Sequence, residues 1–207
     1  AWQFDEDKIK TAAQRSSIVK SFRESPTGIL IGTELILEDP RLTAALGIVI
    51  NLDNLFSIPD YGIHERMLGT LAKLEEKSPG QPLYIQTRFP KHPLYQHFIR
   101  HSFKEFLLHE LEERKENDFP PYSIFIRITL EHKNAAERTK RIEAVLEYFK
   151  KINYPLLSYP SFTQTAKHHL LIAVHEERWI KNSESLKQAL DQFPYLADIV
   201  VDPPSIL

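Results

Sequence analysis

The chain has 207 residues, of which 42% are hydrophobic and 26% charged, with a net charge of −2. This composition is typical of a soluble globular protein of one or two domains, and it excludes a uniformly basic nucleic-acid coat and an acidic disordered tail. The lack of cysteine excludes disulfides, thiolate zinc ligands and a cysteine nucleophile. No apolar run approaches the ~20 residues that cross a membrane, so we expect a cytoplasmic protein with no membrane partner.

Hydrophobic periodicity predicts alternating helices and strands in the first part of the chain. Helices are expected at residues 6–24, 40–46, 61–77 and 94–117. Continuous apolar runs, typical of strands buried on both faces, lie at 29–31, 46–50 and 83–85. This alternation favours a parallel α/β sheet, and three strands are too few for a whole doubly wound domain. Because the chain also opens without a methionine, we expect it to be a piece of a longer protein.

Pro120-Pro121 breaks any helix and predicts a boundary between domains at residues 1–118 and 119–207. The second part then has a regular element order. Strands are predicted at 123–130, 154–163, 168–175 and 197–201, and helices at 135–152 and 183–193. The strand at 123–130 alternates in polarity and is expected to be half-buried. The order β-α-β-β-α-β predicts a ferredoxin-like α+β domain.

No motif for an active site or a metal site is present. The chain has no G-x-x-x-x-G-K-[ST] phosphate loop, no G-x-S-x-G elbow and no H-E-x-x-H zinc motif, so no catalytic and no metal-binding residue is predicted. His168 and His169 are adjacent in a strand and point to opposite faces, so they cannot share one ion. The acidic residues Glu34, Glu38 and Asp39 form either a paired acid site or, more often in such cases, the solvated face of a loop.

Nucleic-acid binding by bulk charge is not indicated, because residues 118–207 hold eleven basic and eleven acidic residues. A local patch remains, since basic residues cluster around the start of the helix at 135–152: Lys133, Arg138, Lys140 and Arg141. Four aromatic residues are either stacking platforms for single-stranded bases or, as we favour, core residues: Tyr122, Phe125, Tyr159 and Phe162.

Several short motifs in collinear order resemble the C-terminal portion of the PriA family (primosomal protein N-prime) of bacterial replication-restart helicases. Near the start, Phe4–Asp7 is similar to the family's "IDRD", and Ile29–Leu35 is similar to the strand before "GTQM". The stretch similar to "LDxDxxLFSxDFRxxER" consists of Asn51–Ser57, Asp60-Tyr61 and Glu65-Arg66, and it is followed by the matching segments Tyr84–Thr87 and His92–Leu94. Glu110–Arg114 and Phe119–Tyr122 are similar to "ELxER…YPPF", and Val201–Leu207 is similar to the terminal "DVDPxSLL". The match covers nearly the whole chain. It implies part of a second, RecA-like helicase lobe with a parallel sheet, followed by the C-terminal domain.

Two departures from the family motifs concern the ATPase. Where the family has "GTQMxxKGxxFP", the chain continues from Gly32-Thr33 with Glu34 and loses the Gln, Lys and Gly, so that Glu38 and Asp39 stand where phosphate or the DNA backbone would approach. Where the family has "QxxGRAGR", the chain has residues 67–77 with no arginine. Such arginines stabilise the charge on a transferring γ-phosphoryl group, so this chain alone is not expected to complete an ATPase site.

The resemblance implies DNA and protein binding rather than catalysis. The partners it implies are forked or single-stranded DNA, single-stranded-DNA-binding protein and primosome proteins. ATP and zinc are implied as possible cofactors of a full-length parent only. The residues proposed to contact nucleic acid are Arg127, Lys140, Arg141, Lys167 and His168, the last two standing where the family has a basic, aromatic strand. His168 and His169 would add charge there below pH ~6.5, the ordinary His pKa.

Gly32, Thr33 and Asp53 are either vestiges of the motor lobe or structural residues: a strand-end glycine, a turn threonine and a helix-capping aspartate. The leading hypothesis is the C-terminal region of a PriA-like protein, inactive as an ATPase on its own, that binds DNA and replication partners. One alternative is a helicase lobe completed by an upstream ATP-binding lobe. The other is a scaffold that binds no DNA and docks proteins through the helix at 94–117.

Overall fold

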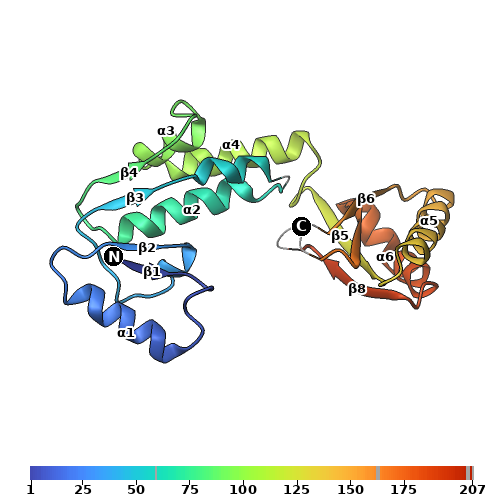
Figure 1. The fold of residues 1–207 in the computed structure, drawn as a ribbon. Coiled ribbons are helices and arrows are strands. Elements are labelled where there is room, and N and C mark those ends of the chain that lie inside the picture. Colours follow the sequence, from blue (N-terminus) through green and yellow to red (C-terminus); the bar gives the residue numbers. More distant parts are fainter. Residues whose placement is uncertain (59, 162–163, 204–205, 207) are drawn as a thin grey trace. The chain divides into compact units, whose positions relative to one another are not determined.

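The computed structural model describes residues 1–58, 60–161, 164–203 and 206. Its contacts divide the chain into two compact units (Figure 1). Unit 1 consists of Ala1–Ile58 and Ile63–Phe106, and unit 2 of Pro59–Gly62 and Leu107–Leu207. The domain boundary expected at residues 118 and 119 stays a prediction.

Unit 1 is an α/β unit with parallel strands, as the sequence predicts, but the strands form two separate pairs and not one sheet. Strand β1 (Trp2–Phe4) pairs with β2 (Leu30–Gly32), and β3 (Gly47–Val49) pairs with β4 (Leu83–Ile85). The helices are α1 (Ala12–Arg23), α2 (Ile63–Glu76), α3 (Pro93–Ile99) and the first turn of α4 (Phe103–Glu116). Met67 and Leu71 of α2 and Leu94 and Tyr95 of α3 form the core against one face of the β3–β4 pair.

The strands of unit 1 are not buried on both faces, which corrects the expectation from their apolar runs. Ile31 of β2 is 62% exposed, and Ile48 and Tyr84 of the β3–β4 pair are 59% and 58% exposed. Val49 and Leu83, which point the other way, pack in the core. The reason is that among the described residues helices cover only one face of the β3–β4 pair.

Three helix predictions for unit 1 also need correction. Helix α1 begins at Ala12 and not at residue 6, because Thr11 and Gln14 form a capping box there. Residues 40–46 form no helix. The helix expected at 94–117 is two helices, α3 and α4, which are separated where His101 adopts a left-handed backbone conformation (φ 51°).

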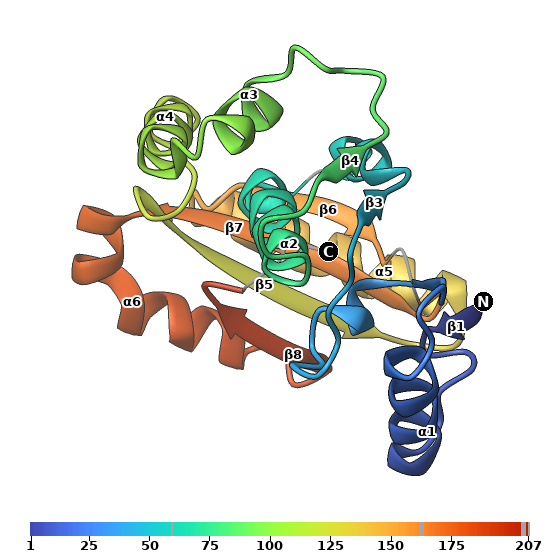
Figure 2. The same cartoon turned by 90° about the vertical axis from the view of Figure 1, so that its left-hand side faces the viewer.

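Unit 2 contains a four-stranded antiparallel sheet with the order β6-β7-β5-β8, which Figure 2 shows face-on. Its strands are β5 (Ser123–Glu131), β6 (Leu156–Pro160), β7 (Lys167–His175) and β8 (Leu196–Val201), and its helices are α5 (Ala135–Lys151) and α6 (Glu176–Asp191). Ile126, Ile128, Leu170 and Ile172 of the central strands pack against both helices. This order confirms the ferredoxin-like βαββαβ domain.

The other face of this sheet is covered too, so β5 is not the half-buried strand that its alternation predicts. Phe125 is only 4% exposed, and the Tyr61 ring contacts it edge-on at 5.5 Å. The backbone N–H of Asp202 donates to the Phe125 carbonyl at 2.7 Å. The Tyr61 hydroxyl donates to the Pro203 carbonyl at 3.1 Å, and the Tyr159 hydroxyl donates to the Ile206 carbonyl. Pro203 and Ile206 therefore lie on this side of the sheet.

Candidate nucleic-acid interface

Basic residues gather at one end of the unit 2 sheet, where β5 ends, α5 begins and β7 begins. Backbone contacts join these segments, since the N–H of His132 donates to the Ala166 carbonyl at 3.0 Å. We call this surface the basic end of the sheet, and it consists of Lys133, Arg138, Lys167 and His168. Two of the five predicted nucleic-acid contacts, Lys167 and His168, belong to it. A surface of this charge fits the phosphates of a nucleic-acid backbone.

The turn that carries the basic end is held by local hydrogen bonds. Asn134 caps α5 by accepting a bond from the Glu137 N–H at 3.1 Å. Arg138 donates from Nη1 to the His132 carbonyl at 2.8 Å, which fixes its guanidinium beside the turn. Lys133 is exposed, and Lys167 lies 3.8 Å from the half-exposed Glu131 carboxylate. An exposed pair of this kind is weak, so Lys167 stays available to a phosphate.

His168 and His169 lie on opposite faces of β7, as their adjacency predicts. His168 Nε2 lies 2.8 Å from the Ser158 hydroxyl, while His169 Nδ1 lies 3.1 Å from the Thr129 hydroxyl on the other face. Burial lowers the pKa of both rings, and the charges of Arg138 near His168 and of Arg127 near His169 lower it further. The positive charge expected below pH ~6.5 therefore arises only at lower pH.

The other three predicted contacts have different surroundings. Arg127 is half-buried in the middle of β5, on the face opposite α5. Arg141 binds Glu137 at 3.3 Å and lies 5.0 Å from the centre of the Tyr195 ring, so it serves packing within the unit. Lys140 is an exposed residue of α5. The five residues do not form one surface.

The aromatic residues considered as stacking platforms are mainly core residues, in line with the interpretation that the sequence favours. Phe125 lies beneath Tyr61 and Phe119, with ring centres 5.5 and 5.9 Å away. Tyr159 packs against His169 at 5.6 Å, and Tyr122 is half-buried. Phe162 lies outside the described residues. Phe125 is therefore not a free platform for bases, and the Tyr159 hydroxyl is engaged by the Ile206 carbonyl.

Two of the three residues considered as motor vestiges, Gly32 and Asp53, have clear structural roles in unit 1. A Cβ at Gly32 would lie 2.0 Å from the Phe4 carbonyl oxygen, so only glycine fits where β2 passes β1. Thr33 precedes the single turn Glu34–Ile36, and its side chain makes no capping bond there. Asp53 is buried and does not cap a helix. Its carboxylate accepts bonds from Thr87 Oγ1 at 2.8 Å, the Arg88 N–H at 2.6 Å and the Tyr95 hydroxyl at 2.7 Å.

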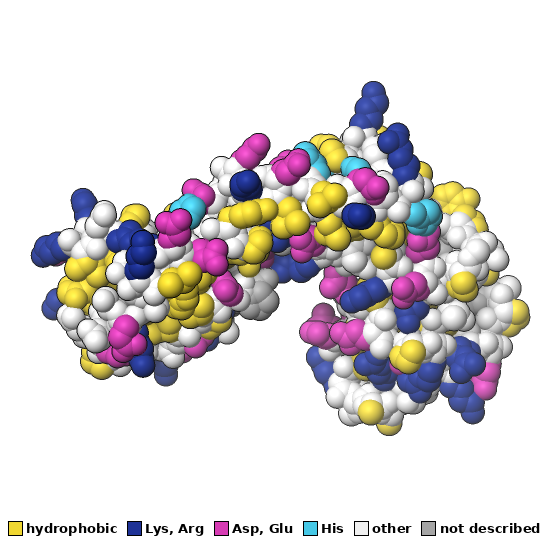
Figure 3. All heavy atoms as spheres, turned by 180° about the vertical axis from the view of Figure 1, so that it is seen from behind, with side chains coloured by type: hydrophobic (Ala, Val, Ile, Leu, Met, Phe, Trp, Pro, Cys, Tyr) yellow, Lys and Arg dark blue, Asp and Glu magenta, His cyan; other side chains and the backbone are white. Residues whose placement is uncertain are grey.

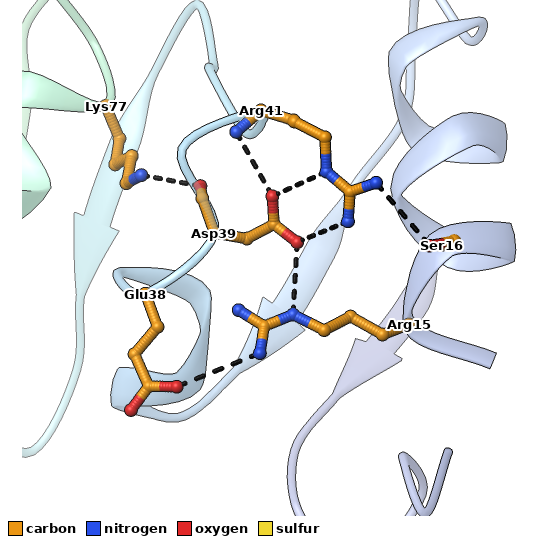
Figure 4. Close-up of polar contacts among 6 residues, drawn as sticks. All are labelled: Arg15, Ser16, Glu38, Asp39, Arg41 and Lys77. Atoms are coloured by element: carbon orange, nitrogen blue, oxygen red, sulfur yellow. Dashed lines mark hydrogen bonds and ion pairs between the residues drawn. The ribbon is translucent and has the colours of Figure 1, made fainter. Parts of the chain in front are cut away.

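Asp39 is a buried carboxylate held by two arginines, and this corrects its interpretation as part of a solvated loop (Figure 4). Arg41 donates from Nε to Oδ1 at 2.9 Å and from Nη2 to Oδ2 at 2.7 Å, and Arg15 donates from Nε to Oδ2 at 3.1 Å. Lys77 binds the Asp39 carbonyl at 2.6 Å. Asp39 therefore serves as an anchor between α1 and its own loop and presents no free acid to a phosphate.

The other two acidic residues of that group are exposed, as the solvated-loop interpretation predicts. Glu38 lies 3.9 Å from Arg15, and Glu34 accepts a bond from Thr70 Oγ1 at 3.1 Å. Sequence reasoning missed Arg15 and Arg41 as partners of Asp39 and Tyr95 as a partner of Asp53. Arg15 is 24 residues from Asp39 and Tyr95 is 42 residues from Asp53, so no local pattern signals these pairs.

No protein-family model matches the chain. The fold defines its class as a parallel α/β unit followed by a ferredoxin-like domain. Curated proteins named PriA are similar to the chain in sequence. Replication restart protein PriA of Synechocystis sp. is 27% identical over 222 residues, 99% of this chain and 26% of that protein. PriA of Bacillus subtilis is 27% identical over 72% of this chain, and PriA of Chlamydia pneumoniae 24% over 75%.

The matched stretch makes up 26%, 19% and 22% of the lengths of these three relatives, so the chain spans about a fifth to a quarter of each. The chain is similar in sequence to PriA proteins over most of its length, which confirms the family resemblance drawn from its motifs. No helix among the described residues is long and apolar enough to cross a membrane.

Proposed function

We propose that the chain is the C-terminal region of a PriA-like replication restart protein of the cytoplasm and binds forked or single-stranded DNA. The observation that carries this proposal is the similarity to PriA of Synechocystis over 99% of the chain. The basic end of the sheet supports it, because Lys133, Arg138 and Lys167 give residues 118–207, whose charges balance, one local surface for phosphates. By the same resemblance, single-stranded-DNA-binding protein and primosome proteins are its proposed partners.

ATP hydrolysis is not proposed for this chain alone. Where the family carries its arginine motif, the chain has α2, whose Met67, Leu68 and Leu71 are core residues of unit 1. The one basic residue of this stretch within α2, Lys73, is exposed and is a point charge without the bidentate fork of arginine. ATP and zinc would then belong to other parts of a longer parent. We expect the chain to hydrolyse no ATP with or without single-stranded DNA.

Two alternatives make different predictions. If an upstream lobe completes the helicase, the parent hydrolyses ATP in a DNA-stimulated reaction. If the chain is a protein scaffold, it binds no DNA, and its contacts run through exposed apolar residues such as Leu107 and Leu108 of α4, which are 42% and 52% exposed.

Anisotropy of labelled single-stranded DNA tests the DNA-binding proposal on the whole chain. The variant Lys133→Ala/Lys167→Ala removes two charges from the basic end. Lys150→Ala/Lys151→Ala is a matched control, because it removes two charges from the other end of α5, where Lys151 pairs with Glu147 as Lys167 pairs with Glu131. We expect weaker binding and a shallower salt dependence for the first variant only. Equal losses in both variants, or no binding by the unaltered chain, would refute the proposal.

A further inference from the structure

A second basic surface lies in unit 1, beside α1. It is an open hollow of about 370 Å³, lined by Ser16, Val19, Lys20, Arg23, Glu24 and Arg41. We call it the α1 hollow. In Figure 3, Lys and Arg side chains gather over this end of the unit. The residues of α1 that line it belong neither to the family motifs nor to the basic end of the sheet.

The spacing along α1 places the hollow's basic residues on one helix face. Ser16, Lys20 and Arg23 stand at positions i, i+4 and i+7, so they line the same side of the helix. Val19 forms the floor and is 2% exposed. The lining carries three positive charges and one negative charge, which favours an anionic ligand.

Arg41 reaches the hollow from the opposite side with a fixed orientation (Figure 4). Asp39 holds its Nε and Nη2, while Nη1 lies 3.5 Å from the Ser16 hydroxyl. That distance is the long limit of a hydrogen bond, so both groups keep donor capacity for a stronger acceptor. Arg15 shares the buried Asp39 carboxylate with Arg41 and also lies 3.9 Å from the exposed Glu38 carboxylate.

Two simpler roles account for part of this arrangement. Lys20 and Arg23 stand in the last turn of α1, where positive charge opposes the helix dipole. Glu24 lies 3.9 Å from Lys20, but both are exposed, and such pairs contribute little. Neither role requires Ser16 or the anchored Arg41 to face the same space. A bound phosphate group would require this arrangement, because it accepts hydrogen bonds from a hydroxyl, an ammonium and a guanidinium together.

We propose that the α1 hollow binds a backbone phosphate of single-stranded nucleic acid. This rests on the proposed function and adds to it a contact in unit 1, separate from the basic end of the sheet. Lys20 and Arg23 supply charge, Arg41 supplies an oriented donor edge, and the Ser16 hydroxyl completes the set.

The test compares Lys20→Ala/Arg23→Ala with Lys181→Ala/Lys187→Ala, which removes two exposed charges from α6. Binding of labelled single-stranded DNA is titrated across salt for each whole chain, after circular dichroism has confirmed that it is folded. For the hollow variant we expect the slope of log affinity against log salt to become shallower by about 0.7, since each phosphate contact on a single strand contributes about 0.7 and the hollow holds one phosphate. The α6 variant should keep the parent slope. Ser16→Asp, which places a carboxylate in the hollow, should weaken binding as well.

The possible results separate this inference from the proposed function. If the parent binds DNA and the hollow variant keeps its slope, the inference is wrong and the proposed function stands. If the parent binds no DNA, the proposed function fails, and titration with inorganic phosphate decides on the hollow alone. Shifts of the Ser16 and Lys20 amide resonances that vanish in Lys20→Ala/Arg23→Ala would then support a site for phosphate from another source. Unmoved resonances would refute the site.

Discussion

The hydroxyl of Tyr95 donates a 2.7 Å hydrogen bond to the carboxylate of Asp53, and both side chains are buried. This bond joins the segment after β3 to helix α3. Burial alone would raise the pKa of Asp53, but its bonds from Arg88, Tyr95 and Thr87 outweigh burial and lower it. Burial and then the Asp53 bond raise the pKa of Tyr95 to about 12. Both groups therefore keep the protonation states that the bond needs at neutral pH.

Replacing Tyr95 by phenylalanine should destabilise unit 1 by about 1.5–3 kcal/mol, the typical contribution of a hydrogen bond to a charged group. The unfolding of unit 1 can be followed through Trp2 in a Trp179→Phe background, because each unit holds one tryptophan. Tyr84→Phe is the control, since Tyr84 is 58% exposed on β4. Equal midpoints in urea for the two variants would contradict the role assigned to the Asp53–Tyr95 bond.

The Asp39 cluster should make unit 1 sensitive to acid. The hydrogen bonds from Arg41, followed by that from Arg15, hold the pKa of Asp39 well below its ordinary value despite burial. The unfolded chain then takes up a proton at higher pH than the folded chain. The stabilisation is complete above the unfolded pKa of about 3.9 and is lost as the pH falls below it. Asp39→Asn should flatten the pH dependence of Trp2-monitored stability between about pH 5 and 2. An unchanged profile would refute this.

The two histidines of β7 should titrate below about 6.5, the ordinary His value. Ring-proton NMR of the whole chain measures both. Arg127→Gln should raise the pKa of His169 more than that of His168, and Arg138→Gln should do the reverse, because each arginine lowers the pKa of its own neighbour. Since the unfolded rings bind protons at higher pH than the folded rings, unit 2 should lose stability as the pH falls below about 6.5. Identical shifts in both variants would show that the charges are not paired in this way.

Asp202 should stabilise unit 2 by holding the end of β8 against β5. It adopts a left-handed conformation (φ 48°), and its Oδ1 accepts a 3.3 Å bond from the Phe125 N–H. Asp202→Ala loses this bond and places an alanine in a disfavoured conformation, for an expected cost of about 2 kcal/mol. Asp202→Asn keeps an acceptor and tolerates the conformation, so its cost should be small. Trp179 fluorescence in a Trp2→Phe background measures both, and equal costs would contradict this account.

The sequence predicts unit 2 well because its signals are local. Period-two alternation in β5, the strong apolar run of β7 and the amphipathic pattern of α5 each lie within one element. The start of helix α6 is predicted seven residues too late, because the helix follows β7 directly and His175 gives no side-chain capping bond. The cover of the second sheet face is also missed, because Tyr61 and Pro203 are 142 residues apart in sequence.

Unit 1 is harder to predict from its sequence. The apolar stripe of 94–117 is continuous in pattern, since Phe98, Phe103 and Phe106 all pack in one core, and this hides the break at His101. The Thr11–Gln14 capping box is readable in the sequence and would have placed the start of α1. Arg41 is a local partner of Asp39, two residues along the chain, whereas Arg15 and the partners of Asp53 depend on tertiary contacts that no spacing rule finds.

The central claim, that this PriA-like region still recognises replication forks without a motor of its own, is tested most directly by anisotropy. The whole chain is titrated with labelled forked, single-stranded and duplex DNA at several salt concentrations. We predict tighter binding to forked or single-stranded DNA than to duplex, with affinity that falls as salt rises. Absence of binding to all three at ~50 mM salt would contradict the claim and favour a protein-docking scaffold.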